Sequence, residues 1–468
     1  MCLAYPSPYH VGMSSLGYQR IYRALMETDG LMCERAFLQD ELVEGKADEI
    51  PVTYESLTPI GDFSCIALSV AYELEIAGLI QLLAAARIPQ LREERGHEHP
   101  FILGGGPLTF SNPLPLAPFV DAMIIGEAEG IVAEVCREIT TASSREALLD
   151  TLAKIEGVFV PARHGDELGD VAKVDDAMLP AFSCIRTPHT ELANMFLIES
   201  ERGCSRGCTY CVMRRSTNGG MRIVPKDVIL GHVPADAPRV GLVGAAVSDH
   251  PKIVEIVNEL AARGKGVGLS SLRPDRLSDE FVGALKAAGY RTLTTAMDGP
   301  SERMREKLER RARENHLMKV AERAKKHGMD RLKLYLMVGL PDENAEDIDE
   351  CVRFTTELSR VLPIALGIAP FCAKRNTPLD GQPFAGIKVV EDRLDRLRRG
   401  LRGRADVRAT SARWAWVEWV LAQGGPAEGR AVLDAVRAGG KFSHYKRAFE
   451  AMPTTRVRRK LAIVNEAR

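Results

Sequence analysis

Residues 195–211, which read MFLIESERGCSRGCTYC, form the most informative segment of the chain. The apolar run at its start predicts a buried strand. The loop that follows carries Cys204, Cys208 and Cys211 in a C-x3-C-x2-C spacing, with Tyr210 directly before the last cysteine. Three thiolates on a short glycine-containing loop can converge on one iron–sulfur cube, whose usual complement is four cysteines. One iron then keeps an open coordination position, as a catalytic metal requires.

A structural zinc site is the alternative reading of the same cysteines. Zinc sites usually pair two C-x2-C units, and no second unit lies near residues 204–211. The motif also comes immediately after a predicted strand, where the active sites of parallel barrels are built. We therefore predict an iron–sulfur cluster held by these three cysteines.

Alternating strands and helices continue after this motif. Six segments are apolar enough to be strands of a partial (β/α)6 barrel over residues 193–388, and they are residues 195–200, 239–244, 266–272, 291–297, 332–339 and 362–371. Residues 389–468 are predicted to form a basic helical C-terminal region. Cys372 follows the sixth predicted strand, and it is interpreted either as a buried packing residue or as a group that faces the reaction site.

The amino-terminal part of the chain shows a second alternation of strands and helices. Four apolar runs predict strands of a doubly wound parallel sheet over residues 1–140, and they are residues 3–6, 65–70, 101–106 and 121–126. Residues 141–192 are polar and turn-rich, so we expect a connector. The fold class is therefore α/β, with two parallel-sheet domains.

Composition excludes several classes of protein. The 468 residues have a formal net charge of -1, and no apolar run of about 18 residues predicts a membrane span. We expect a cytoplasmic protein, in which ten cysteines are not a disulfide framework. Residues 391–468 hold 18 Lys and Arg against 9 Asp and Glu, which could attract RNA, although a solvated helical face is the more common explanation.

The cysteine loop after the first strand resembles that of the radical S-adenosylmethionine (SAM) superfamily. The resemblance implies a [4Fe–4S] cluster whose open iron chelates the amino and carboxylate groups of SAM. It implies reductive cleavage of SAM to a 5′-deoxyadenosyl radical, with electrons from an external one-electron donor such as flavodoxin or ferredoxin. It also places Tyr210 against the adenine.

Later segments resemble the SAM-binding segments of the same superfamily. At the end of the second strand the family often carries Gly-Gly-Glu, and this chain has Gly244-Ala245-Ala246 instead. In TAMDGPSE, Asp298 stands where the family usually has Glu. The resemblance implies that SAM contacts Gly244, Ala245, Ser248, Ser270, Ser271, Arg273, Asp298, Gly339, Leu340 and Pro341.

The amino-terminal segments resemble the cobalamin-binding-type domain that precedes many radical SAM barrels, and the whole chain is closest to a family in which the two are fused. Ser69 and Gly104–Gly106 are the expected contacts of cobalamin. The D-x-H-x-x-G pattern of proteins that ligate cobalt is broken around His10, which reads PYHVG. Ligation by His10, cobalamin without a protein ligand, and a sheet used for another purpose all remain open.

The predicted function is radical chemistry on a small-molecule or peptide substrate, with methyl transfer to an unactivated carbon as the leading outcome. One alternative is a methylthiotransferase-like enzyme that modifies RNA or protein. Such an enzyme would hold a second cluster, for which Cys2, Cys33 and Cys65 are the candidate ligands. The other alternative is a cluster-bearing binding protein without catalysis.

Overall fold

The computed structural model describes residues 1–40, 49–214 and 217–452. Contacts divide the chain into two units. The first unit comprises Met1–Ala193 together with Val420–Arg468, and the second comprises Asn194–Trp419. No helix in the described ranges is both long enough and apolar enough to cross a membrane.

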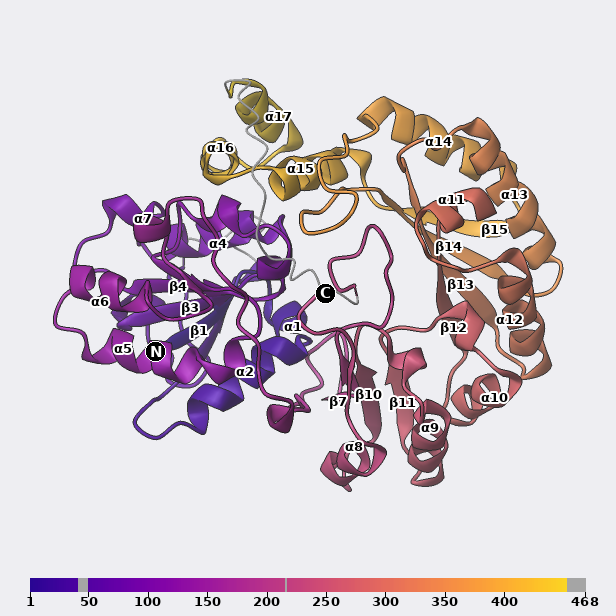
Figure 1. Cartoon of the computed structure of the whole chain (residues 1–468), viewed down its shortest axis with the longest axis horizontal. Coiled ribbons are helices and arrows are strands. Elements are labelled where there is room, and N and C mark those ends of the chain that lie inside the picture. Colours follow the sequence, from indigo (N-terminus) through magenta and orange to yellow (C-terminus); the bar gives the residue numbers. More distant parts are fainter. Residues whose placement is uncertain (41–48, 215–216, 453–468) are drawn as a thin grey trace. The chain divides into compact units, whose positions relative to one another are not determined.

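The first unit is built on a six-stranded sheet in the order β2-β1-β3-β4-β5-β6 (Figure 1). All neighbouring strands are parallel except the pair of β5 and β6. The strands are β1 (Cys2–Tyr5), β2 (Glu34–Phe37), β3 (Cys65–Ser69), β4 (Phe101–Gly105), β5 (Ala122–Ile124) and β6 (Val158–Phe159). The chain runs from β1 outward to β2 and then back across to β3, so the topological switch point lies between β1 and β3.

Helices surround this sheet. They are α1 (Tyr9–Gly12), α2 (Leu16–Met26), α4 (Glu75–Ala85), α5 (Val132–Thr141), α6 (Arg145–Leu152), α7 (Pro161–His164), α16 (Pro426–Arg437) and α17 (Phe442–Glu450). One buried cluster joins strand residues such as Leu3 and Ala67 to Tyr18 of α2 and Val135 of α5. Helix α4 lies on the other side of the sheet (Figure 1) and packs against α16. The predicted doubly wound parallel sheet is confirmed.

Two strands of this sheet were not expected from the sequence. Strand β2 is only four residues long and half of it is polar, ERAF. Strand β6 has two residues and lies inside residues 141–192, which the sequence analysis treats as a connector. Both lie at the edges of the sheet, where short and partly polar strands are common.

The second unit contains two parallel sheets, ordered β11-β10-β7 and β12-β13-β14-β15, and a two-stranded antiparallel pair of β8 and β9. Their bounds are β7 (Met195–Glu199), β8 (Glu201–Arg202), β9 (Arg222–Ile223), β10 (Arg239–Val243), β11 (Gly266–Leu269), β12 (Thr292–Asp298), β13 (Arg331–Val338), β14 (Ile364–Pro370) and β15 (Ala405–Ala409). The six predicted strands are all present, as β7 and β10 to β14. The α/β fold class is therefore confirmed in this unit as well.

Helices follow the parallel strands of the second unit in turn (Figure 1). They are α8 (Lys226–His232), α9 (Ile253–Ala262), α10 (Asp279–Ala287), α11 (Glu302–Lys307), α12 (Glu314–Lys326), α13 (Ala345–Ser359), α14 (Ile387–Gly400) and α15 (Ala412–Gln423). Side chains of β13 alternate between the two faces of the sheet, with Leu332 and Leu334 buried and Tyr335 exposed. Strand β13 thus buries one face and leaves the other partly open, whereas β7 is buried at every residue.

Residues 389–468, predicted as a basic helical region, also contain a strand that was not predicted, β15, which pairs in parallel with β14. Its sequence, ADVRA, alternates small and charged residues, and a short edge strand needs no apolar run. The described part of this region also contains the helices α14 to α17. Residues 453–468 lie outside the described residues.

Candidate active site

The loop with the three cysteines is closed at its base by the pairing of β8 with β9. Glu201 pairs with Ile223, and Arg202 pairs with Arg222. Gly203 has φ +82, and a Cβ there would lie 1.9 Å from the carbonyl oxygen of Gly220. Only glycine fits this crossing, so the local sequence explains why the loop folds back next to the carboxyl end of β7.

Cys208 is buried in this loop, while Cys204 and Cys211 are half-buried. The Cys211 N–H donates to the Cys208 carbonyl over 3.3 Å. Burial raises the pKa of Cys204, and it raises the pKa of Cys211 to about 11, with the neighbouring cysteines adding to both shifts. Thiols brought together in this way favour a bound cation, which stabilises the thiolate form.

The donor set fits a cube better than a single ion. No three Cys, His, Asp or Glu side chains in the described ranges have the arrangement needed to hold one metal ion. The three thiolates of a cube each bind a different iron, so they lie farther apart than ligands of one ion. Three cysteines on one loop are the donor set that a cube with one open iron requires, so the residues present fit the predicted cluster.

A buried charge network joins Cys208 to the end of β12. The Arg310 guanidinium hydrogen-bonds the Cys208 side chain and forms an ion pair with Asp298. Asp298 also accepts a hydrogen bond from Tyr210, and its φ of +63 turns the backbone at the strand end. Burial raises the pKa of Tyr210 and of Asp298, and Arg310 opposes both shifts. The structure thus brings three predicted residues, Cys208, Tyr210 and Asp298, together with Arg310, which the sequence analysis did not select.

A second charge network ties the cysteine loop to the neighbouring strand ends through Asp249. Its carboxylate accepts from Ser205 over 3.1 Å and from Arg206 Nε over 3.0 Å. It also pairs with Arg273 over 3.4 Å and with Arg276 over 3.1 Å. Burial opposes ionisation of Asp249, but the hydrogen bond from Arg206 and the charge of Arg273 outweigh it and lower the pKa.

Residues predicted to contact SAM meet at the ends of β10 and β11. The Ser270 hydroxyl donates to the Gly244 carbonyl over 2.8 Å and accepts from the Gly244 N–H over 3.0 Å. Ser271 accepts from the Val247 N–H over 2.9 Å. These hydroxyls hold the backbone after β10 in place, and Ala245 is the exposed residue of the turn.

Arg273 lies beside this turn and is almost fully buried. Its backbone N–H donates to the Ser248 hydroxyl over 3.0 Å. Its guanidinium Nη2 donates to both carboxylate oxygens of Asp275, each over 2.9 Å. Its Nη1 is buried and has no hydrogen-bond partner among the described residues. Buried guanidinium atoms are normally hydrogen-bonded, so this atom fits the carboxylate of a ligand such as SAM.

The predicted adenine contacts form a tight turn after β13. Gly339 has φ +82, and its N–H donates to both Glu343 carboxylate oxygens, over 3.0 and 3.1 Å. The Leu340 N–H donates to the same carboxylate over 3.3 Å, and Pro341 follows. Glu343, which the sequence analysis did not select, therefore fixes the shape of this turn.

Glu201 was also missed by the sequence analysis. It is fully buried, and its Oε1 accepts from the Ala246 N–H over 2.6 Å. A Cβ at Gly244 would lie 2.1 Å from the same oxygen. In the sequence, Glu201 is marked only as an acid two residues after the strand and three before Cys204. Its side chain contacts Gly244 and Ala246, which are more than 40 positions away, so a local pattern could not select it.

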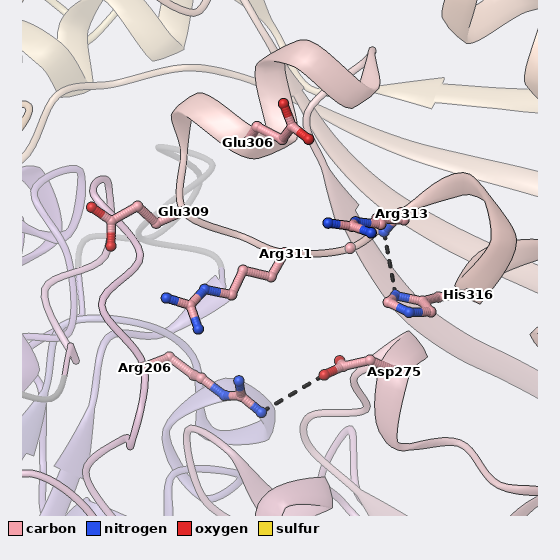
Figure 2. A pocket seen from close by; sticks show the side chains of 8 residues that line it. Arg206, Asp275, Glu306, Glu309, Arg311, Arg313 and His316 are labelled. Atoms are coloured by element: carbon pink, nitrogen blue, oxygen red, sulfur yellow. Dashed lines mark hydrogen bonds and ion pairs between the residues drawn. The ribbon is translucent and has the colours of Figure 1, made fainter.

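A polar pocket of about 460 Å³ lies beside the cysteine loop (Figure 2). Arg206 of the loop and Asp275 both line the pocket. Nη2 of Arg206 lies 3.7 Å from Oδ2 of Asp275. The remaining lining residues come from α11, α12 and the segment between them, and they are Glu306, Glu309, Arg311, Ala312, Arg313 and His316. Charges of both signs line the pocket, so it suits a polar group rather than an apolar one.

Cys372 lies just beyond β14, as predicted. Its thiol donates to the Ala415 carbonyl of α15 over 3.1 Å. A role for this thiol at the reaction site stays a prediction.

The predicted cobalamin contacts lie at the carboxyl ends of β3 and β4 in the first unit. A Cβ at Gly104 would lie 2.9 Å from the Met123 side chain. A Cβ at Gly106, where φ is +101, would lie 2.7 Å from the Val70 carbonyl oxygen, next to Ser69. Packing within the chain therefore explains both glycines. Gly105 differs, because its nearest atom would be the Ile124 carbonyl oxygen at 3.8 Å.

Two family profiles match the chain. The profile described as "Radical SAM proteins, N-terminal" matches residues 17–161, and "Radical SAM superfamily" matches residues 198–355. The second match contains the cysteine loop, and the first covers strands β2 to β6 of the first unit with the helices between them.

Two curated relatives extend these matches. An uncharacterized protein of Methanocaldococcus jannaschii is 27% identical over 415 residues, covering 84% of this chain and 83% of the relative. An uncharacterized methyltransferase of Pyrococcus horikoshii is 20% identical over 274 residues, covering 56% of this chain and 59% of the relative.

Among solved structures, the cobalamin-dependent SAM radical enzyme OxsB shares the fold. With aqua-cobalamin bound, it matches 86% of this chain with a TM-score of 0.54 and 11% identity. With aqua-cobalamin and SAM bound, the TM-score is 0.53 and the identity 12%. This chain spans 57% of the length of OxsB. Together with the profile matches over both units, this shared architecture leads to one conclusion: the chain belongs to the radical SAM superfamily, whose members use a [4Fe–4S] cluster and SAM.

Proposed function

We propose that this radical SAM enzyme transfers a methyl group to an unactivated carbon of a small-molecule or peptide substrate. The observation that carries the proposal is the loop with Cys204, Cys208 and Cys211 at the carboxyl end of β7. Near it lies Arg273, whose buried Nη1 has no hydrogen-bond partner among the described residues. When bound, the cluster and SAM would supply a 5′-deoxyadenosyl radical for hydrogen abstraction, and cobalamin would supply the methyl group. Radical SAM enzymes also need an external one-electron reductant, here a flavodoxin or ferredoxin.

The chain's own residues would bind and orient these groups. Cys204, Cys208 and Cys211 would hold the cluster, and Arg310 would donate a hydrogen bond to one of its thiolates. Hydrogen bonds to a cluster sulfur raise the reduction potential, because they stabilise the added negative charge. Arg273 would pair with the carboxylate of SAM, since a fixed guanidinium recognises a carboxylate well.

Cobalamin would lie at the carboxyl edge of the first sheet. Open sheets of this order bind ligands at the switch point between β1 and β3. Ser69 ends β3, and Gly105 at the end of β4 leaves room for a close approach of a ligand to the backbone. The similarity to OxsB supports this placement only at the level of the fold.

Burial weighs against the second-cluster alternative. Cys2 and Cys65 are the first residues of β1 and β3, so they lie at the amino edge of the sheet, opposite the ligand-binding edge. Burial raises the pKa of Cys2 and Cys65 well above the usual value, and it raises that of Cys33 to about 12. Metal ligation needs the thiolate, and all three thiols pack in the core instead.

The test is the iron content after anaerobic reconstitution. The wild-type chain should bind about four irons and cleave SAM to 5′-deoxyadenosine under reduction. Replacing Cys204, Cys208 and Cys211 by alanine should abolish both properties. Cys184→Ala is the matched control, because Cys184 is an exposed cysteine outside the loop. A triple variant that keeps a full cluster would falsify the assignment.

A further inference from the structure

One face of the sheet of β12 to β15 is partly exposed. Leu332 and Leu334 of β13 are buried on the side where α12, α13 and α14 pack (Figure 1). Arg331, Lys333 and Tyr335 alternate with them and point to the opposite side, which we call the open face. Tyr335 is 46% exposed there, although β13 has a neighbouring strand on each side. An exposed tyrosine ring on an inner strand offers a large apolar surface to a ligand.

The Tyr335 ring lies flat across the neighbouring strand. Tyr335 pairs with Gly367 of β14, which pairs in turn with Arg408 of β15. A Cβ at Gly367 would lie 2.7 Å from two atoms of the Tyr335 ring, so the ring extends over β14 toward β15. On its other side Tyr335 pairs with Ala296 of β12. The residues beside the ring in this row are therefore too small to cover it.

Cations lie on both sides of this ring. Asp406 of β15 shares the open face, and it pairs with Arg331 over 3.8 Å and with Arg408 over 2.8 Å. Lys333 has no hydrogen bond or ion pair with any residue in the described ranges. Its Nζ lies 4.7 Å from the centre of the Tyr335 ring. The open face thus holds one ammonium group that no acid neutralises, next to an exposed aromatic ring.

The row of Tyr335 also has a suitable place and size for a substrate. Gly339, which is expected to contact SAM, follows β13 four residues after Tyr335, or about 13 Å along the strand. The row crosses four strands about 4.8 Å apart, which is about 14 Å in all. That width suits a small molecule. A molecule bound here could extend toward the carboxyl ends of the strands, where barrels of this type carry out their chemistry.

We propose that the open face binds the substrate, and that the substrate is a small molecule with a carboxylate or phosphate group beside a planar ring. Lys333 pairs with the anionic group, because its own charge is otherwise unneutralised. Tyr335 packs against the ring, since Gly367 and Ala296 leave its surface free. Arg408 is a second cation within the same row. The inference names the substrate class of the proposed function and rests on it.

The experiment measures binding of three probes to the reconstituted full chain by isothermal titration calorimetry without SAM. The probes are phenyl phosphate, phenylacetate and phenylacetamide, which has the shape of phenylacetate without its charge. We expect at least one anion to bind about 3- to 10-fold more tightly than the amide, because Lys333 is half-buried and water screens part of the attraction. The anion that binds more tightly identifies the group that the face prefers. Tyr335→Leu should weaken all three probes by about 2- to 10-fold.

Three lysine variants test the assignment. Lys333→Gln should abolish the preference for the anion, and Lys333→Arg should keep it, because the charge is retained. Lys319→Gln is the matched control, since Lys319 is an exposed lysine of α12 outside the open face, and it should also keep the preference. Equal affinity of the wild-type chain for the anions and the amide would overturn the inference, as would an undiminished preference in Lys333→Gln. Failure of the wild-type chain to cleave SAM under reduction would overturn the proposed function instead.

Discussion

Replacing Gly203 by alanine should open the base of the cysteine loop. The new Cβ would lie 1.9 Å from the Gly220 carbonyl oxygen, whereas such contacts are not found below 3.0 Å. The two backbones must therefore separate by about 1.1 Å, the difference between these distances. The φ of +82 costs a further 1–2 kcal/mol, roughly, in any residue with a Cβ. Strands β8 and β9 pair over only two residues each, so they cannot absorb the shift.

We expect Gly203→Ala to lose about 1–3 kcal/mol to overpacking in addition to the φ cost. Gly289→Ala is the matched control, because Gly289 has φ +93 and nothing within 4 Å of its Cβ position. Iron content after reconstitution and the thermal unfolding midpoint are measured on both variants. Gly203→Ala should bind less than half the iron that Gly289→Ala binds. Equal iron content would refute the claim that the crossing of Gly203 and Gly220 shapes the loop.

Two further predictions concern the first unit. If cobalamin binds as proposed, His10→Ala should leave the bound cobalt unchanged, because His10 is exposed and its motif is broken. Gly105→Leu should instead reduce cobalt uptake, because the side chain blocks a close approach to the backbone. Cobalt loss on His10→Ala would contradict a cobalamin without a protein ligand. Burial raises the pKa of Glu75, so the stability from its protonated form is lost as pH rises through that pKa. Glu75→Gln should therefore gain stability relative to wild type as the pH rises above the ordinary pKa of 4.5, and a constant difference in unfolding midpoint would contradict this.

The sequence predicted the elements whose patterns are local. Each of the six predicted strands of the second unit is an apolar run bounded by turn residues, and all six are present. Strands β2, β6 and β15 were missed because they are short edge strands whose residues are partly polar. Their formation depends on a neighbouring strand that already offers free backbone groups, and that information is not local.

The candidate site divides in the same way. The three cysteines lie close together in the sequence, so their spacing was sufficient to select them. Arg310 lies in the charged run ERRAREN, which looks like a solvated surface, yet it is mostly buried against Asp298. Glu201 contacts a turn that is distant in the chain. The roles of such residues depend on tertiary contacts, and the pattern of a single sequence does not show which residues make those contacts.

The charges around the cysteine loop follow one physical rule. Burying a charge is costly unless a partner of opposite sign is present. Arg206 meets this condition through Asp249, and Arg310 meets it through Asp298. Glu201 and Arg273 each keep one buried atom without a partner in the described part of the chain. Both groups contact the turn after β10, so a ligand that satisfied either atom would stabilise the folded protein when it binds.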